Sequence, residues 1–160
     1  KLFKGNAFVE YLAIGKLKNI TIHASKRLEK ITNGRYGIEV GEDGSFLIRD
    51  NFNGGVKRRA ATLSGGETFL VSLSLALALS NQIQLKGKTN LEFFFLDEGF
   101  GTLDTSLLDR VISSLETLKE DEKLKVGIIT HVEELKERVP RRLEVLEAIP
   151  GERGSKVILN

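Results

Sequence analysis

Two short, nearly continuous apolar segments constrain the fold of this chain more than any other feature. Leu91 to Leu96 runs directly into the acidic pair Asp97-Glu98, and Val126 to Thr130 ends at His131. Strands that are apolar on both faces are typical of a parallel sheet covered by helices. Helix-like segments alternate with these strands, so we expect an α/β fold with a mainly parallel sheet and flanking helices.

The rest of the pattern predicts further elements around this sheet. Apolar residues recur every three to five positions over 8–31, which predicts an amphipathic helix ended by Asn33-Gly34. Alternation on either side of Glu42-Asp43-Gly44 predicts a β-hairpin. The other expected elements are a loop over 50–62, helices over 68–85 and 105–119, a short helix capped by Thr130 and Glu133, and closing strands over 143–148 and 156–159.

Composition places the chain in a broad class. Its 160 residues with 41% hydrophobic content suit one domain over 1–160, and the net charge of +2 neither indicates nor excludes a local basic patch. The longest nearly apolar segment, 69–79, is shorter than the roughly 20 residues that span a bilayer. We expect a soluble, intracellular protein without membrane contact, and the lack of methionine predicts a piece of a longer chain.

A glycine pair stands at the start of the predicted apolar helix. In Ser64-Gly65-Gly66-Glu67, the glycines let the backbone turn its amides toward a ligand, and a helix N-terminus favours an anion such as phosphate. Ser64 and Glu67 also have the spacing of a capping box, which does no more than start a helix. The residues alone leave both interpretations open.

Polar side chains follow both apolar strands. Carboxyl ends of parallel strands line the ligand crevice of α/β sheets, so Asp97, Glu98 and His131 are expected in one site. One carboxylate can hold magnesium through water, and the other can orient or deprotonate an attacking water. The alternatives are that the carboxylates only cap the next turn and that His131 is structural. A zinc site is excluded because the chain has no cysteine and only two, distant histidines.

Two basic segments are candidates for phosphate contacts. Lys57-Arg58-Arg59 is either a solvated loop or a contact to DNA phosphates. Gly87-Lys88-Thr89 imitates the end of a phosphate-binding P-loop, but Gln82 stands where the first glycine is required. The segment also lies between a helix and a strand in the wrong order, so it is rejected.

Several motifs in order resemble one family. Leu63 to Glu67 is similar to the signature motif of ABC-type ATPases, Phe93 to Glu98 to their Walker B strand, Gly101 to Asp104 to the D-loop, and His131 to the switch histidine. The string from Leu96 to Asp104 resembles the SbcC-type DNA double-strand-break repair ATPases, relatives of the chromosome-structure ATPases.

The resemblance implies the C-terminal half of a split ATPase head. Residues 1–33 would form a coiled-coil-base helix and 34–160 an α/β lobe, while Walker A lies in the N-terminal half. ATP hydrolysis is expected only when the two halves are joined, with the chain inactive alone. The implied roles are γ-phosphate contact in the opposite head by Ser64, Gly65, Gly66 and Glu67, magnesium binding by Asp97, water activation by Glu98, phosphate sensing by His131, and cross-dimer contact by Asp104.

The same resemblance implies partners. These are the N-terminal half, a second head joined through ATP, double-stranded DNA, and an SbcD-type nuclease near Phe3, Phe8 and Tyr11. Alternative functions are the head of a DNA-entrapping chromosome-organising ATPase, a transporter nucleotide-binding subunit, and an interaction domain without catalysis. The transporter is disfavoured because such subunits carry Walker A in the same chain.

Overall fold

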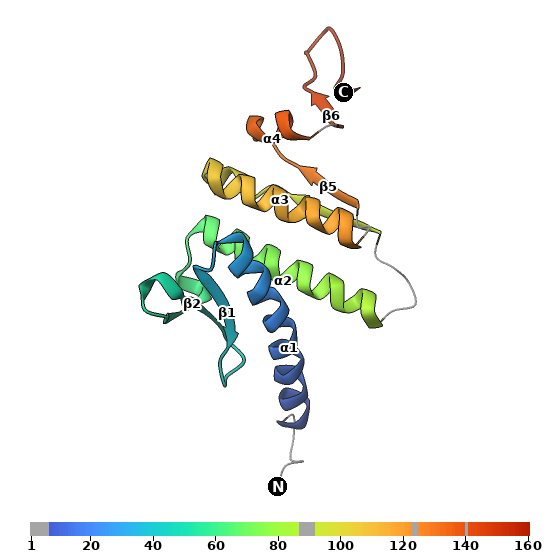
Figure 1. Cartoon of the computed structure of the whole chain (residues 1–160). Helices are drawn as coiled ribbons and strands as arrows, with labels where there is room; N and C mark the ends of the chain where they lie inside the picture. Colours follow the sequence, from blue (N-terminus) through green and yellow to red (C-terminus); the bar gives the residue numbers. More distant parts are fainter. Residues whose placement is uncertain (1–6, 87–91, 123–124, 140) are drawn as a thin grey trace.

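The computed structural model describes residues 7–86, 92–122, 125–139 and 141–160. A long helix α1 and a small antiparallel sheet occupy one end of the molecule, α2 crosses its middle, and α3 with β4 and β5 follows toward the C-terminal hairpin (Figure 1). The elements are α1 (Ala7–Ile31), β1 (Tyr36–Val40), β2 (Phe46–Asp50), β3 (Val56–Arg59), α2 (Gly65–Lys86), β4 (Phe93–Asp97), α3 (Thr105–Glu122), β5 (Lys125–Ile129), α4 (Glu133–Arg138), β6 (Leu143–Leu146) and β7 (Lys156–Leu159). Short 3-10 turns cover Asn51–Asn53, Ala60–Thr62 and Phe100–Thr102.

Helix α1 confirms the predicted amphipathic helix. Its C-terminal half buries Ala24, Leu28 and Ile31, whereas its N-terminal half extends away from the other elements (Figure 1). Asn33 and Gly34 both adopt positive φ, and Gly34 N–H donates to the Glu29 carbonyl, which ends the helix as expected. The apolar spacing therefore predicted the helix correctly, although its N-terminal turns have no core to cover.

The small sheet corrects one expectation. The hairpin β1–β2 forms as predicted, but part of the expected loop over 50–62 is strand β3, which pairs antiparallel with β2. Its sequence, Val56 to Arg59, is basic and lacks apolar alternation because it is an edge strand whose side chains are mostly exposed. Pairing with β2 overrides the weak local signal.

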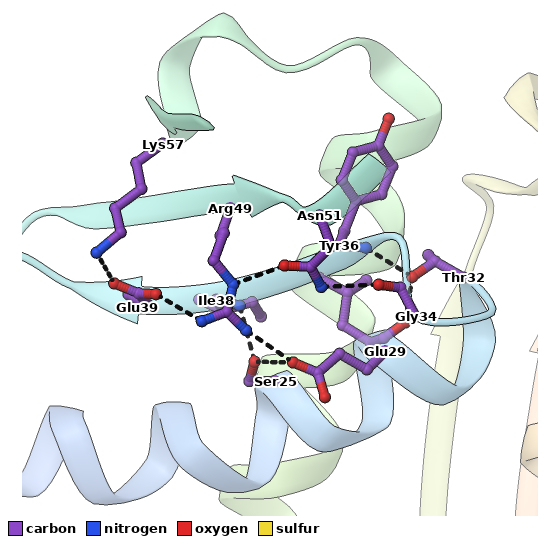
Figure 2. Close-up of polar contacts among 11 residues, drawn as sticks. Ser25, Glu29, Thr32, Gly34, Tyr36, Ile38, Glu39, Arg49, Asn51 and Lys57 are labelled. Carbon is purple, nitrogen blue, oxygen red and sulfur yellow. Dashed lines mark hydrogen bonds and ion pairs between the residues drawn. The ribbon is translucent and has the colours of Figure 1, made fainter. Parts of the chain in front are cut away.

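Polar contacts attach α1 to this sheet (Figure 2). Arg49 on β2 lies 3.2 Å from the Glu29 carboxylate of α1 and 3.0 Å from that of Glu39 on β1. The Ser25 hydroxyl of α1 accepts a hydrogen bond from Ile38 N–H at 3.0 Å. These contacts fix how the sheet lies against the helix, with Ile38 and Ile48 buried beneath them.

The core runs through the middle of the molecule. Helix α2 has apolar side chains on most of its surface, since it packs against α1 on one side and against the segments that follow it in the chain on the other (Figure 1). The buried side chains come from several elements and include Leu28, Ile48, Leu70, Leu77, Phe100, Leu108, Val111 and Leu135. The predicted core face of α3 is confirmed for Leu108, Val111 and Leu115, with Ile112 partly buried; the Leu118 side chain lies outside the described residues.

Strands β4 and β5 form the predicted parallel pair, connected through α3. Phe93 pairs with Lys125 and Asp97 with Ile129, so both strands end at the same edge. The expectation that β4 is buried on both faces is wrong within this chain. Phe93, Phe95 and Ile129 are more than half exposed, because among the described residues this sheet has two strands and helices cover one face.

The C-terminal segment forms the predicted closing hairpin β6–β7, in which Leu143 pairs with Leu159. The capping box expected before α4 does not form: the Thr130 hydroxyl accepts from Val132 N–H, and α4 begins without a side-chain cap. Val132 is the N-cap and Glu133 is the first helical residue, so α4 begins two residues later than a capping box from Thr130 would require. None of the helices in the described ranges is long and apolar enough to cross a membrane.

Candidate functional site

Glu98 and His131 meet where β4 and β5 end. The Glu98 Oε2 atom lies 2.8 Å from His131 Nδ1, and Glu98 N–H donates to the Ile129 carbonyl at 2.9 Å. Glu98 has φ of 58°, an uncommon conformation for a non-glycine residue, which turns the chain out of the strand. The pairing that strand order predicted is therefore present, and an imidazole at this position can orient the carboxylate through a hydrogen bond.

Gly99 allows Phe69 of α2 to lie directly against the backbone after Glu98. Gly99 has φ of 96°, and a Cβ there would overlap the Phe69 ring. The same ring packs edge-on against buried Phe100, with centroids 5.0 Å apart. The start of α2 and the residue that follows Glu98 are thus in close contact.

The Ser64–Glu67 turn, residues 64–67, forms both halves of the capping box. Ser64 N–H donates to Glu67 Oε2 at 2.9 Å, and Glu67 N–H donates to the Ser64 hydroxyl at 3.3 Å. A Cβ on Gly66 would approach the Thr102 carbonyl at 3.1 Å, so any side chain there would require a shift of a few tenths of an ångström at this contact. Ser64 and Gly65 are exposed, which leaves the helix start accessible to an anion.

The carboxylate of Glu67 is bound from within the chain. Its Oε1 atom accepts from the Tyr36 hydroxyl at 2.7 Å and from the Arg58 guanidinium at 2.6 Å. Burial alone would raise the pKa of Glu67, but the hydrogen bonds from Arg58, Ser64 and Tyr36 outweigh burial and lower the pKa to about 2. Glu67 is therefore a fixed anion at neutral pH, and its carboxylate is committed to contacts inside this chain.

Asp104 lies at the start of α3, where its carboxylate accepts from Leu107 N–H at 2.9 Å, as the predicted cap. It is exposed, and the 3-10 turn before it contacts both the glycines of α2 and the His131 side. A Cβ on Gly101 would come within 3.8 Å of His131 Nε2. The structure brings Gly66, Gly101, Glu98 and His131 to one continuous surface.

Asp97 is exposed at the last position of β4, beside the Glu98–His131 pair. No group of three or more potential side-chain ligands occurs in the described parts of the chain. Magnesium retains several waters and commonly takes only one or two carboxylates together with substrate phosphates. An exposed carboxylate at a strand end fits that role, whereas a closed metal cage does not.

Of the other predicted contact residues, Arg58 is bonded to the Ser64–Glu67 turn, and the other described ones lie on β3 or on the N-terminal part of α1. Lys57 is paired with Glu39 at 2.6 Å and Arg58 with Glu67, while Arg59 is exposed on β3. Phe8 and Tyr11 are exposed on the N-terminal part of α1, and Phe3 lies outside the described residues. The ion pair with Glu67 gives Arg58 a role within the chain itself.

Two sets of contacts at the site were not predicted from the sequence: those made to Glu67, and that of Phe69 with Gly99. Tyr36 lies on β1 and Arg58 on β3, a strand that was expected to be a loop. These long-range partners have no local signal. Gly99 after the acidic pair stands out in the sequence, but its contact with the Phe69 ring cannot be predicted from it.

The sequence is similar to known proteins over nearly its full length. A family model described as SbcC/RAD50-like, Walker B motif, matches residues 45–117. The SbcC subunit of the SbcCD nuclease from Clostridium acetobutylicum is 62% identical over 159 residues, and that from Bacillus subtilis is 57% identical over 158 residues. Each alignment covers 99% of this chain and 14% of the relative, so the chain spans a small part of those proteins. These matches favour the SbcC-type interpretation over the transporter subunit.

Solved structures share the fold. One, described as "Structural biochemistry of ATP-driven dimerization and DNA stimulated activation of SMC ATPases", aligns with a TM-score of 0.68 at 18% identity, covering 94% of this chain and 89% of that chain. The SMC head domain from Thermotoga maritima aligns with a TM-score of 0.61 at 20% identity, covering 96% and 51%. The helices, the parallel pair and the antiparallel hairpins therefore have the arrangement of part of an SMC-type head.

Proposed function

Because residues 45–117 of this chain match a family model described as SbcC/RAD50-like, Walker B motif, we propose that the chain is the C-terminal half of an ATP-hydrolysing head that controls a DNA-end-processing nuclease. The observation that carries the proposal is the 2.8 Å pairing of Glu98 with His131 at the adjacent carboxyl ends of β4 and β5. Glu98 has an uncommon backbone conformation and is hydrogen-bonded to an exposed histidine, an arrangement that catalysis explains and a purely structural interaction domain does not.

In this proposal each of the chain's site residues has a separate role in phosphoryl transfer from ATP to water. Glu98 orients the attacking water and accepts its proton, while His131 holds that carboxylate and faces the terminal phosphate. The Ser64 hydroxyl and the amides of Gly65 and Gly66 bind the γ-phosphate of ATP held by a second head, and Asp104 lies at the contact between heads. Magnesium, which neutralises phosphate charge when bound, is held from this chain by Asp97. Catalysis of this kind depends on positioning and charge.

The exposed face of β4 and β5 supports the proposal that an N-terminal half of the head packs against this chain. Phe93 and Phe95 stack on this face with centroids 6.3 Å apart, and Phe95 is 68% exposed. A contiguous aromatic surface on a strand expected to be covered fits the N-terminal half that carries Walker A. The further proposed partners are a second head, an SbcD-type nuclease at Phe3, Phe8 and Tyr11, and double-stranded DNA, with Lys57, Arg58 and Arg59 as candidate contacts, in the cytoplasm or nucleoid.

The test is magnesium-dependent ATP turnover by this chain alone and after co-folding with its N-terminal half. We expect no turnover alone and turnover in the complex. Glu98→Gln should abolish hydrolysis while ATP-bound dimers still form, and Glu116→Gln, an exposed glutamate on α3, serves as the matched control. Turnover by the chain alone would contradict the split head.

A head of the chromosome-organising class is the second candidate, because the solved structures that share this fold include SMC ATPases and an SMC head domain. It predicts ATP-dependent dimers and DNA entrapment without a bound nuclease. Co-purification of the assembled head with an SbcD-type nuclease distinguishes the two: retention of the nuclease supports the leading proposal, and its absence supports the alternative.

A further inference from the structure

One carboxylate connects three segments that lie far apart in the sequence. Glu67 Oε1 accepts from Tyr36 of β1 and Arg58 of β3, while Glu67 Oε2 accepts from Ser64 N–H at the start of α2. The side chain of Glu67 is only 20% exposed, and that of Arg58 is 31% exposed. This is the most extensively bonded carboxylate among the described residues of the site region.

We propose that Tyr36 and Arg58 are positioning residues that act through Glu67 to fix the geometry of the Ser64–Glu67 turn. The inference rests on the proposed function, in which this turn contacts ATP held by the opposite head. It deepens that function by assigning control of the turn to the antiparallel sheet β1–β2–β3, which otherwise has no part in the site.

The hydrogen bonds of Glu67 explain how its position can fix the geometry of the Ser64–Glu67 turn. Its two oxygens have separate tasks, since Oε2 holds the Ser64 amide and Oε1 is anchored by the sheet. Without the anchor, the carboxylate can rotate about its side-chain bonds and the amide of Ser64 loses its fixed acceptor. An anion site made of backbone amides depends on such fixed directions.

Two cations lie near the ring of Tyr36. The guanidinium of Arg35 lies 4.7 Å and that of Arg58 lies 5.8 Å from the ring centroid, within the range of cation–π attraction. Arg58 also donates to the Thr62 carbonyl at 3.2 Å, immediately before the turn. Figure 2 shows the Tyr36 hydroxyl pointing away from the Arg49 contacts that attach the sheet to α1. The hydroxyl is therefore free of those contacts and available for Glu67.

The arrangement predicts a defect that appears in trans. Loss of the anchor alters the turn that faces the opposite head's ATP, whereas the Glu98–His131 pair of the same head keeps its contacts. A substitution with a purely structural effect would instead impair the head that carries it. Whether turnover is lost in the opposite head or in the substituted head therefore distinguishes a positioning role of Tyr36 and Arg58 from a role in folding.

The experiment uses differently tagged, reconstituted heads purified as mixed dimers. In the first dimer, one head carries Tyr36→Phe and its partner carries Glu98→Gln. In the second dimer, one head carries both substitutions and its partner is unmodified. The head that lacks Glu98→Gln is the one that can hydrolyse ATP in each dimer. In the first dimer, the head competent for hydrolysis faces an intact turn, so turnover should equal that of a dimer with Glu98→Gln in one head. In the second, the competent head faces the altered turn, and turnover should fall by about tenfold, as expected for loss of a hydrogen bond to a charged group.

The same pair of dimers is made with Arg58→Gln, Arg58→Lys and the exposed control Arg141→Gln. Arg58→Lys should restore part of the turnover lost with Arg58→Gln, and Arg141→Gln should behave as unmodified protein. Equal losses in the two arrangements would overturn the inference while leaving the proposed function intact. Absence of ATP turnover by unmodified, well-folded heads would overturn the proposed function and this inference together.

Discussion

The Nδ1 atom of His131 lies 2.8 Å from a carboxylate oxygen of Glu98, at the point where two parallel strands end side by side. The two residues come from different strands, and their contact depends on the register that pairs Asp97 with Ile129. The imidazole of His131 can hold the Glu98 carboxylate in one orientation, which suits the water activation proposed for Glu98.

Replacing His131 with alanine removes that direction while leaving the carboxylate. We expect ATP turnover by the reconstituted head to fall about 100-fold or more, the usual contribution of a positioned acid–base partner. His23→Ala is the matched control, because His23 is exposed on α1. Turnover within a few-fold of the unmodified head would show that His131 is not part of the catalytic group.

Replacing Gly99 with alanine should disrupt the contact between α2 and the Glu98 loop. The added Cβ meets the Phe69 ring, and the residue has φ of 96°, so overpacking adds to backbone strain. We expect a loss of about 2–4 kcal/mol in the free energy of unfolding, measured by urea denaturation. Gly151→Ala tests strain alone, since its φ is 81° and no atom lies within 4 Å of the added Cβ. It should cost about 1–2 kcal/mol. Equal costs at both positions would contradict a role for Phe69.

Much of the fold could be predicted from local patterns. The helix over 8–31, the first hairpin, and the two strands preceding the acidic pair and His131 follow from apolar spacing and turn residues, and the structure contains them. Strand β3 could not be predicted this way, because an edge strand with three basic residues gains its structure from its neighbour β2. The bare face of β4 was also missed, because a continuous apolar run does not say which chain covers it.

The site was partly predictable for the same reason. Strand ends placed Glu98 and His131 together, since sheet topology alone brings them to one edge. The partners of Glu67 depend on where β1 and β3 lie relative to α2, and no spacing in the sequence encodes that. The charge of Lys57-Arg58-Arg59 predicts either a solvated loop or a contact to DNA phosphates, and it does not indicate that Arg58 pairs with Glu67 at 2.6 Å.

The lowered pKa of Glu67 predicts a pH-dependent stability. Its pKa of about 2 in the folded chain lies below the ordinary value of 4.5, so the folded state favours the ionised carboxylate. The stabilisation is complete above about pH 4.5 and is lost as the pH falls toward 2. Glu67→Gln should lower the free energy of unfolding by roughly 1–3 kcal/mol at pH 6, with the difference shrinking steadily below pH 4.5. A difference that does not change between pH 6 and pH 2 would contradict this origin.

Ser74 offers a test of core packing in α2. Its side chain is fully buried, and its hydroxyl has no hydrogen-bond partner in the described structure. Removing an unsatisfied buried hydroxyl relieves a desolvation cost, so Ser74→Ala should leave the free energy of unfolding unchanged or raise it by about 1 kcal/mol. Leu77→Ala, one turn further along the same helix, should lower it by about 2–5 kcal/mol. A marked loss with Ser74→Ala would mean that the hydroxyl has a partner.

The exposed aromatic face of β4 should show its importance only when the N-terminal half is present. Phe95 is 68% exposed, so Phe95→Ala removes little buried surface and should leave the stability of this chain nearly unchanged. If the N-terminal half covers this face, the same change removes a central aromatic anchor and should weaken association of the halves by about tenfold or more. Phe52→Ala is the matched control, because Phe52 is 71% exposed but lies in the turn between β2 and β3. Binding measured by titration of one purified half with the other should separate the two variants. If both bind equally well, the second half covers a different surface, and the bare face of β4 needs another partner.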